Sequence, residues 1–383
     1  MKHVLKRAEL LIRRRFIEHS RKPFTGKLVQ SPAPIVNTPT PRILLLRQDR
    51  LGDVICSTPV LHALREHFPR GRLDVLLSRN NIALANLVQN WCDRVWCYDK
   101  TLVSFLRLRR ELRRQRYDVV VDLMDNPSTT STLFLREIGS PIRIGIVKDN
   151  AWVYTHCVPL LDRSRIHYVE RIAQLLLPFG IDPMQCSLKL RYPLSTTDVA
   201  EAASALDLQR CPERVGFVFV HISTRHAPLQ WGWERYCMAI AELRAQMPEL
   251  AIGIGSSSDD RTAAEEIAHR TGAFVLPMLP FHRYAALMHF ARLLVSPDTA
   301  IVHVAAAMNV PSVVLYHQGN PALMPWYPYG APYRALVVRE HESVAAVSPD
   351  VVVEAAQELL SGKEPSHMER IFARSSHSES SIR

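Results

Sequence analysis

Residues 42–69 read RILLLRQDRLGDVICSTPVLHALREHFP, and this stretch predicts the class of fold. The apolar run at residues 42–47 is short, as in a strand buried within a sheet. A polar loop then leads into a helix-forming segment at residues 53–68. A second strand, turn and helix begin at residue 293, in LLVSPDTAIVHVAAAMNVPSVVLYHQGNP. Repeats of this pattern favour parallel sheets that are covered by helices.

The same rhythm continues around both stretches. In the first half we expect further strands at 72–78, 94–99, 118–123 and 143–146, and helices at 102–116 and 128–138. A joining region with a helix near 165–179 follows. In the second half we expect strands at 215–223, 251–256, 274–276, 293–296, 312–317 and 334–339, and helices at 233–247, 260–270, 283–291, 299–308 and 349–361. The pattern predicts an α/β protein with two doubly wound Rossmann-like domains, and a cleft between them at the carboxyl ends of the strands.

Length and composition fit this division. The chain has 383 residues, of which 47% are hydrophobic and 22% charged, so it can form two cores and is not a disordered chain. We expect a basic helix and a Pro-rich linker at residues 1–40, a first domain with the joining region at 41–212, a second domain at 213–365, and a flexible tail at 366–383. The linker is expected because four of the eleven residues in SPAPIVNTPTP (31–41) are proline.

The net charge of +10 is unevenly distributed. Residues 1–30 hold nine bases and two acids, and residues 102–116 hold six arginines and one glutamate, so the rest is close to neutral. A coat of positive charge for nucleic acid is therefore not expected. Residues 4–17 have helical amphipathic spacing, which fits either contact with an anionic inner-membrane surface or a solvated or packed extension. The arginines of 102–116 fit either a solvated face or contact with anionic lipid or phosphorylated saccharide.

The seven cysteines are widely spaced and form no C-x-x-C pair. We expect reduced, mostly buried thiols and no zinc site. No apolar run reaches the length of a membrane span, and the N-terminus is too charged for the core of a signal peptide. These features predict a cytoplasmic protein.

Two loops carry the candidate chemistry. In the first, Gly52 is expected to allow a tight turn, and Asp53 is either a base that accepts a proton from a substrate hydroxyl or simply an N-cap. In the second, Thr299 precedes an Ala-rich helix that carries His303 one turn later. The N–H groups at the start of such a helix can bind a phosphate, although a cap before a packing helix is the alternative.

Together, in this order and separation, the two stretches resemble the family 9 glycosyltransferases, the bacterial heptosyltransferases of lipopolysaccharide core assembly. The resemblance covers about residues 42–325. It implies a GT-B fold and an inverting, metal-independent transfer from a nucleotide sugar. It also implies that Asp53 is the general base. The chain contains no D-x-D pair, which agrees with a reaction that uses no metal or other cofactor.

The resemblance also implies binding residues. For the donor they are Ser223, Thr224, Arg225, Ser257, Asp298, Thr299, Ala300 and His303. For the acceptor or the first loop they are Arg47, Gly52 and Thr58.

The chain departs from the family pattern at three donor-side positions. Ala300 replaces a glycine, Leu229 stands where a lysine is common, and Ser257 stands where a glutamate is common. Arg225 or His226 is the nearest replacement for the missing cation. The expected function is transfer of a sugar, most simply heptose from ADP-heptose, onto a lipopolysaccharide core or related lipid-linked glycan. The alternative is a non-catalytic protein that binds a nucleotide or an anionic glycan on the same fold.

Overall fold

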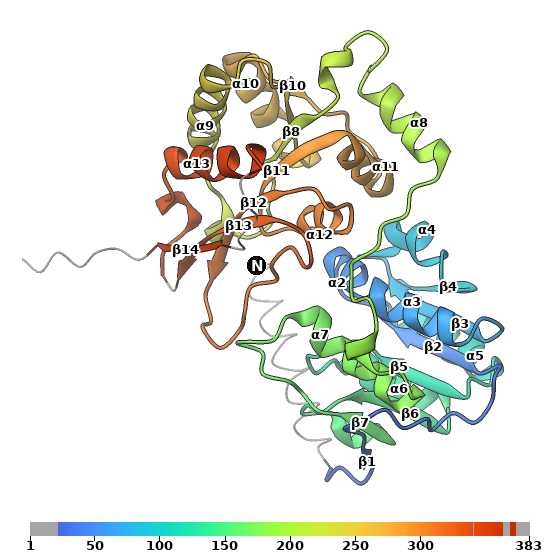
Figure 1. The fold of residues 1–383 in the computed structure, drawn as a ribbon. Coiled ribbons are helices and arrows are strands. Elements are labelled where there is room, and N and C mark those ends of the chain that lie inside the picture. Colours follow the sequence, from blue (N-terminus) through green and yellow to red (C-terminus); the bar gives the residue numbers. More distant parts are fainter. Residues whose placement is uncertain (1–21, 340, 363–367, 373–383) are drawn as a thin grey trace, which may run out of the picture. The chain divides into compact units, whose positions relative to one another are not determined.

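The computed structural model describes residues 22–339, 341–362 and 368–372 (Figure 1). The helix expected at residues 4–17 lies outside these ranges. The chain folds as two compact units, Met1–Pro193 and Leu194–Arg383. The division falls before the expected boundary at 212/213, because helix α8 (Thr196–Ala205) packs on α11 (Phe281–Ala286) of the second unit.

The first unit contains a seven-stranded parallel sheet with the order β1-β7-β6-β5-β2-β3-β4. Its strands are β1 Lys27–Leu28, β2 Arg42–Leu46, β3 Arg72–Ser78, β4 Arg94–Tyr98, β5 Val119–Asp122, β6 Ile142–Ile146 and β7 His156–Val158. Its helices are α2 Leu51–Cys56, α3 Thr58–His67, α4 Ala85–Val88, α5 Leu102–Arg114, α6 Thr129–Ile138 and α7 Tyr168–Ala173, with 3₁₀ turns η1 Ile82–Leu84, η2 Ala151–Val153, η3 Gln174–Phe179 and η4 Pro183–Gln185.

The second unit repeats this plan, with the strand order β10-β9-β8-β11-β12-β13-β14. Its strands are β8 Phe217–His221, β9 Ile252–Gly255, β10 Phe274–Val275, β11 Ala291–Pro297, β12 Ser312–Gln318, β13 Tyr333–Arg339 and β14 Met368–Phe372. Its further helices are α9 Trp233–Gln246, α10 Arg261–Thr271, α12 Ala300–Ala307 and α13 Pro349–Leu360, with 3₁₀ turns η5 Pro212–Arg214, η6 Ala227–Leu229, η7 Ser258–Asp260, η8 Leu287–Phe290 and η9 Val344–Ala346.

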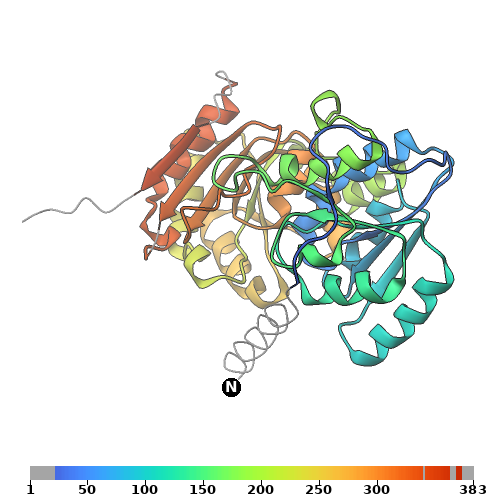
Figure 2. The same ribbon diagram turned by 90° about the horizontal axis from the view of Figure 1, so that it is seen from below.

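Central strands are largely apolar because helices cover both faces of each sheet (Figures 1 and 2). In β2, residues 43–46 are fully buried, and in β5 residues 119–121 are as well. The register places Leu44 beside Asp74 of β3 on one side and Val120 of β5 on the other. Each fully buried leucine or valine contributes roughly 1.5–3 kcal/mol through removal of its surface from water.

Strand order fixes where a ligand can bind in each unit. In the first sheet the chain moves outward from β2 through β3 to β4, and then returns to the other side of β2 with β5. The second sheet does the same at β8 and β11. At such a switch point, the loops after the two strands diverge and leave a crevice at their carboxyl ends. The two candidate loops follow β2 and β11, so each lies at one of these points.

Several expected elements differ in detail. The helix expected at 53–68 is divided into α2 and α3 at Ser57, just before Pro59. The regions 165–179 and 283–291 each contain a short α-helix that continues as a 3₁₀ turn, η3 and η8.

The ends of the chain contain more structure than we expected. β1 pairs with β7, and residues 33 and 35 donate backbone hydrogen bonds to η3, so the ordered body begins before Pro41. The expectation of a flexible tail is wrong for Met368–Phe372, which extends the sheet beside β13. All seven cysteines are free thiols, and four of them are buried. Within the ranges described above, no helix combines the length and the apolarity that crossing a membrane requires.

Candidate active site

The first candidate loop ends in helix α2, which begins earlier than the sequence indicated. Arg50 is the N-cap, with extended backbone angles of φ −117° and ψ 170°. Asp53 occupies the third helical position, and its Oδ2 accepts a hydrogen bond of 3.2 Å from the Arg50 N–H. Asp53 therefore helps to cap the helix from inside its first turn, and it is not the N-cap itself.

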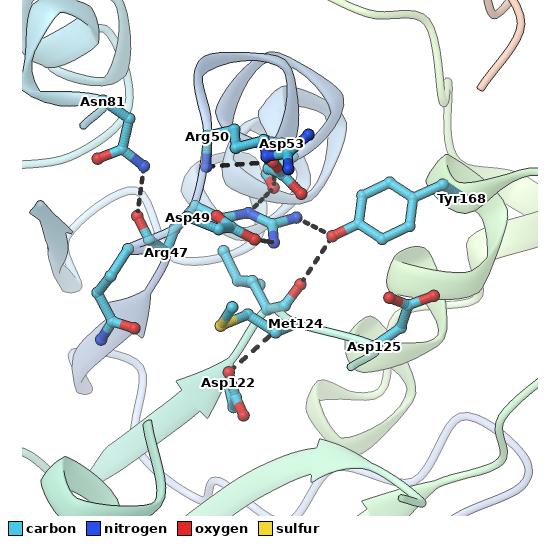
Figure 3. Close-up of polar contacts among 12 residues, drawn as sticks. Arg47, Asp49, Arg50, Asp53, Asn81, Asp122, Met124, Asp125 and Tyr168 are labelled. Atoms are coloured by element: carbon cyan, nitrogen blue, oxygen red, sulfur yellow. Dashed lines mark hydrogen bonds and ion pairs between the residues drawn. The ribbon is translucent and has the colours of Figure 1, made fainter. Parts of the chain in front are cut away.

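The buried side chain of Arg47 holds this loop in place through hydrogen bonds to three residues (Figure 3). Its side chain is 1% exposed and donates in three directions. Nε donates to Ser57 Oγ at 2.8 Å, Nη1 donates to Asp49 Oδ2 at 3.1 Å, and Nη2 donates to the Tyr168 hydroxyl. Because all three contacts are buried or partly buried, Arg47 acts as an anchor for the loop and is not itself exposed to a substrate.

Asp53 has the electrostatics of a base. Burial and the neighbouring Asp49 carboxylate disfavour its ionised form, whereas Arg47 favours it. The net effect raises the pKa of Asp53 to about 8. A carboxylate with a pKa in this range is a much stronger proton acceptor than an ordinary aspartate, and it is about half ionised near pH 8.

The other side of the same switch point is formed by the residues after β5. Asp122, at the end of this strand, pairs with Lys148 at 3.0 Å and accepts a hydrogen bond of 2.7 Å from the Tyr154 hydroxyl. Asp125 pairs with Arg171 of α7 at 2.8 Å, and each of these two side chains is only 2% exposed. Sequence reasoning missed these ion pairs because the partners lie far apart in the chain.

Two residues assigned to the first loop have structural roles. Gly52 adopts an ordinary helical conformation in α2, so the tight turn for which we expected it does not occur there. Thr58 is fully buried. Its hydroxyl donates to Ile55 O at 2.7 Å and accepts from Arg191 N at 3.0 Å, which ties α3 to the segment that leaves the first unit.

In the second unit, three loops reach the switch point, and two of them are joined by a hydrogen bond. Ser223 follows β8, is 7% exposed, and its Oγ accepts a hydrogen bond of 2.7 Å from Ser257 N, in the loop after β9. The Ser257 side chain is exposed and donates to Asp260 Oδ2 at 3.1 Å. The structure thus brings together two of the expected donor residues that are 34 positions apart.

The residues around Leu229 differ in their exposure to solvent. Thr224 Oγ1 accepts from His226 N at 3.2 Å, and Arg225 is exposed. Leu229 is only 7% exposed and belongs to the core of the second unit, beside Trp231. Leu229 is therefore a core residue, whereas Arg225 and His226, the two candidate cations, are both exposed to solvent.

The loop after β11 has the form that the sequence indicated. Thr299 is the N-cap of α12 with extended angles, its side chain does not cap the helix, and its Oγ1 lies 3.3 Å from Ser296 Oγ. Asp298 donates its N–H to Leu315 O at 3.0 Å, and Ala300 is the first residue of α12. The Thr299 side chain therefore leaves this end of the helix uncapped, Val302 donates its N–H to Thr299 O at 3.1 Å, and the helix dipole favours an anion here.

His303 lies one turn further along α12. It is 3% exposed, its Nδ1 has no hydrogen-bond partner among the residues that the structure describes, and its ring lies 6.2 Å from that of Trp326. Burial lowers its pKa to about 4, so the imidazole is neutral at physiological pH. A buried polar atom without a partner is destabilising in the free protein, and a ligand that binds there would relieve this cost.

Sequence reasoning missed two polar groups beside this region. His221, the last residue of β8, has its Nδ1 3.0 Å from the Tyr284 hydroxyl, and burial lowers its pKa to about 4. Ser256, directly after β9, has a buried hydroxyl for which the described part of the chain offers no hydrogen-bond partner. The signal was available, because both residues stand at the carboxyl end of a strand beside the switch point.

The two sheets and their switch-point loops define the class of protein. Each unit is a Rossmann-like α/β fold, of the kind that makes up the GT-B glycosyltransferases. The model of glycosyltransferase family 9 (heptosyltransferase) matches residues 105–352. The chain belongs to this family and is a glycosyltransferase.

Individual relatives agree with this assignment. Lipopolysaccharide heptosyltransferase 3 of Escherichia coli is 25% identical over 287 residues, which cover 69% of this chain and 80% of the relative. The crystal structure of a family 9 glycosyl transferase from Veillonella parvula matches with a TM-score of 0.74 at 20% identity, over 86% of this chain and 99% of that one. The E. coli ADP-heptose lps heptosyltransferase II matches with a TM-score of 0.64 at 20% identity, over 83% of this chain and 98% of that one.

Proposed function

We propose that this glycosyltransferase moves heptose from ADP-heptose onto a lipopolysaccharide core or a related lipid-linked glycan. The names of its relatives support both the donor and the acceptor. The observation that carries the proposal is Asp53, a carboxylate of raised pKa at the switch point of the first sheet.

In the proposed reaction, the Asp53 carboxylate accepts the proton of an acceptor hydroxyl. The hydroxyl oxygen forms a bond to the anomeric carbon of the donor sugar, and the bond from that carbon to the nucleoside diphosphate breaks. A single displacement from the opposite face inverts the anomeric centre. General-base assistance of this kind typically accelerates a reaction by about 10²–10⁴-fold.

The leaving diphosphate gains negative charge as the bond breaks. The uncapped start of α12 at Thr299 and Ala300 offers backbone N–H groups and the positive end of a helix dipole. These groups supply the stabilisation for which other enzymes use a divalent cation, so the proposed reaction is independent of metal. The neutral His303 contributes a hydrogen bond to the diphosphate or the sugar, and Ser223, Thr224, Arg225 and Ser257 hold the rest of the donor.

The proposed place of action is the cytoplasmic face of the inner membrane, where a lipid-linked acceptor is available. The nine bases of residues 1–30 favour attachment to its anionic surface. Removal of residues 1–21 tests this directly: we expect weaker binding to vesicles that contain an anionic lipid. Equal binding by the shortened chain would refute a role for this segment.

The function is tested by incubation of the purified full chain with a panel of nucleotide sugars and lipid-linked acceptors. We expect transfer from ADP-heptose, and a loss of about 10³-fold in Asp53→Asn. The matched control is Asp207→Asn, which changes the same charge at a site with φ 54°, a conformation that asparagine tolerates. Wild-type turnover in Asp53→Asn would show that the base is assigned wrongly.

The same assay decides between transfer and binding alone. The departures at Leu229, Ser257 and Ala300 motivate the second possibility, a protein that binds nucleotides without transfer. Calorimetry with ADP, in parallel with the panel, separates the two. Binding of ADP with no transfer from any donor would favour the non-catalytic alternative.

A further inference from the structure

Helix α5 (Leu102–Arg114) carries two kinds of exposed side chain on one side. Leu102, Val103 and Leu106 are 73%, 77% and 50% exposed, although large apolar side chains are normally covered. They occupy the first two turns of the helix. The later turns carry the arginines that give residues 102–116 their excess positive charge.

The buried side of α5 explains how the helix is held. Ser104, Leu108 and Leu112 are its buried residues and recur every four positions. Leu108 and Leu112 belong to the core cluster that includes Phe134 and Ile138 of α6. The helix is thus fixed by one stripe of residues, and the opposite face is left to solvent. Figure 2 shows α5 at the outer edge of the first unit.

The apolar and basic side chains share this outward face. The face begins with Leu102, Leu106 and Arg110, each four residues after the one before. Arg113 and Arg114 lie three and four residues beyond Arg110. Side chains at these spacings project from one side of a helix, so all five share the outward face. Arg110, Arg113 and Arg114 are exposed, and among the residues that the structure describes none of them has an ion pair. Arg107 is 60% exposed and lies 4.0 Å from Asp99.

We propose that this face of α5, which we call the α5 face, docks on an anionic lipid bilayer. Leu102, Val103 and Leu106 enter the boundary between headgroups and acyl chains, while the guanidinium groups bind lipid phosphates. A polyanion such as nucleic acid accounts for the arginines alone, because contact with it leaves the three apolar side chains in water. An anionic bilayer matches both halves of the face, because it presents phosphates to the arginines and acyl chains to the apolar side chains.

This docking is a property of the first unit and does not depend on which sugar is transferred. It is also separate from the proposed role of residues 1–21, since α5 lies in a different part of the sequence. The two proposals can therefore fail separately. Absence of heptose transfer would not affect the vesicle test of the α5 face, and absence of vesicle binding would not affect the transfer assay.

The test measures binding of the full chain to vesicles of phosphatidylcholine alone and of phosphatidylcholine with phosphatidylglycerol. One variant combines Arg110→Ser, Arg113→Ser and Arg114→Ser. Each arginine near an anionic surface contributes about fivefold in affinity, so we expect on the order of 100-fold weaker binding. A second variant combines Leu102→Ser and Leu106→Ser, and here we expect about tenfold weaker binding.

A matched control removes the same charge elsewhere, by Arg70→Ser, Arg210→Ser and Arg292→Ser, at exposed positions outside α5. We expect this control to bind within about threefold of the wild type, because only charges near the surface contribute. All substituted positions are exposed, and circular dichroism verifies that each variant is folded.

Three results would overturn the proposal. The first is that the arginine variant binds no more weakly than the control. The second is that the wild type shows no preference for vesicles that contain phosphatidylglycerol. The third is that the leucine variant binds like the wild type, since a purely electrostatic surface would then fit a soluble polyanion equally well.

Discussion

Arg47 and Asp49 form an ion pair of 3.1 Å beneath the loop that leads to Asp53. Asp49 Oδ1 is buried. Asp49 is thereby held close to Asp53, and its negative charge disfavours ionisation of that side chain. The loop therefore combines an anchor, Arg47, with a neighbour that strengthens the candidate base.

The pH dependence of transfer should report this arrangement. With Asp53 as the base, kcat/KM for the acceptor rises with pH and levels off above about pH 8, the pKa of Asp53. Asp49→Asn removes the neighbouring negative charge, so the pKa of Asp53 falls and the rise moves to lower pH by at least about one unit. Profiles between pH 5.5 and 9.5 measure this. If Asp49→Asn is slower but its pH profile is the same as that of the wild type, Asp49 does not influence the pKa of Asp53.

The free energy of unfolding should fall as the pH rises, whereas the rate of transfer should rise. Folding raises the pKa of Asp53 from its ordinary value of 3.8 to about 8, so its protonated form stabilises the fold. This contribution is complete below about pH 4 and is lost as the pH rises through about 8. Asp53→Asn cannot ionise, and its stability relative to the wild type should grow by about 4 kcal/mol from pH 5 to pH 9. Urea unfolding at both values checks this, and a constant difference would contradict the raised pKa.

His303 should matter for nucleotide binding and not for folding. His303→Leu removes a buried Nδ1 that has no partner, so the free energy of unfolding should stay the same or rise by up to about 1 kcal/mol. Affinity for ADP should fall about tenfold, as for the loss of one hydrogen bond to a charged group. Calorimetry should also show that the His303 contribution is constant from pH 5.5 to 8, because its pKa is about 4. Undiminished ADP affinity would exclude a contact between His303 and the diphosphate.

The buried pair between Arg171 and Asp125 should be required for stability. Arg171→Met leaves Asp125 with only Arg163, 3.6 Å away, and should lower the free energy of unfolding by about 3–5 kcal/mol. The control is Arg165→Met, whose pair with Asp162 is exposed and should contribute less than about 1 kcal/mol. Urea unfolding of both variants measures the contrast. Equal effects would mean that burial adds nothing to the Arg171 pair.

The sequence predicted the central strands and the two loops because their signals are local. The apolar run at residues 43–46 is fully buried in its parallel sheet, and the turn after it lies at the carboxyl end. The short strands β1, β7 and β14 had no such signal, because they stand at or near a sheet edge and depend on a neighbouring strand.

The site shows the same difference between features that adjacent residues determine and features that depend on distant contacts. The sequence by itself determined that Asp53 and Thr299 stand after buried strands, because period and turn chemistry are properties of adjacent residues. Only the tertiary structure decided that Arg47 meets Tyr168 across 121 positions, that Leu229 lies in a core, and that Asp53 titrates near pH 8. Contacts and burial depend on the order in which the sheet arranges its strands, and the electrostatics of the site follow from them.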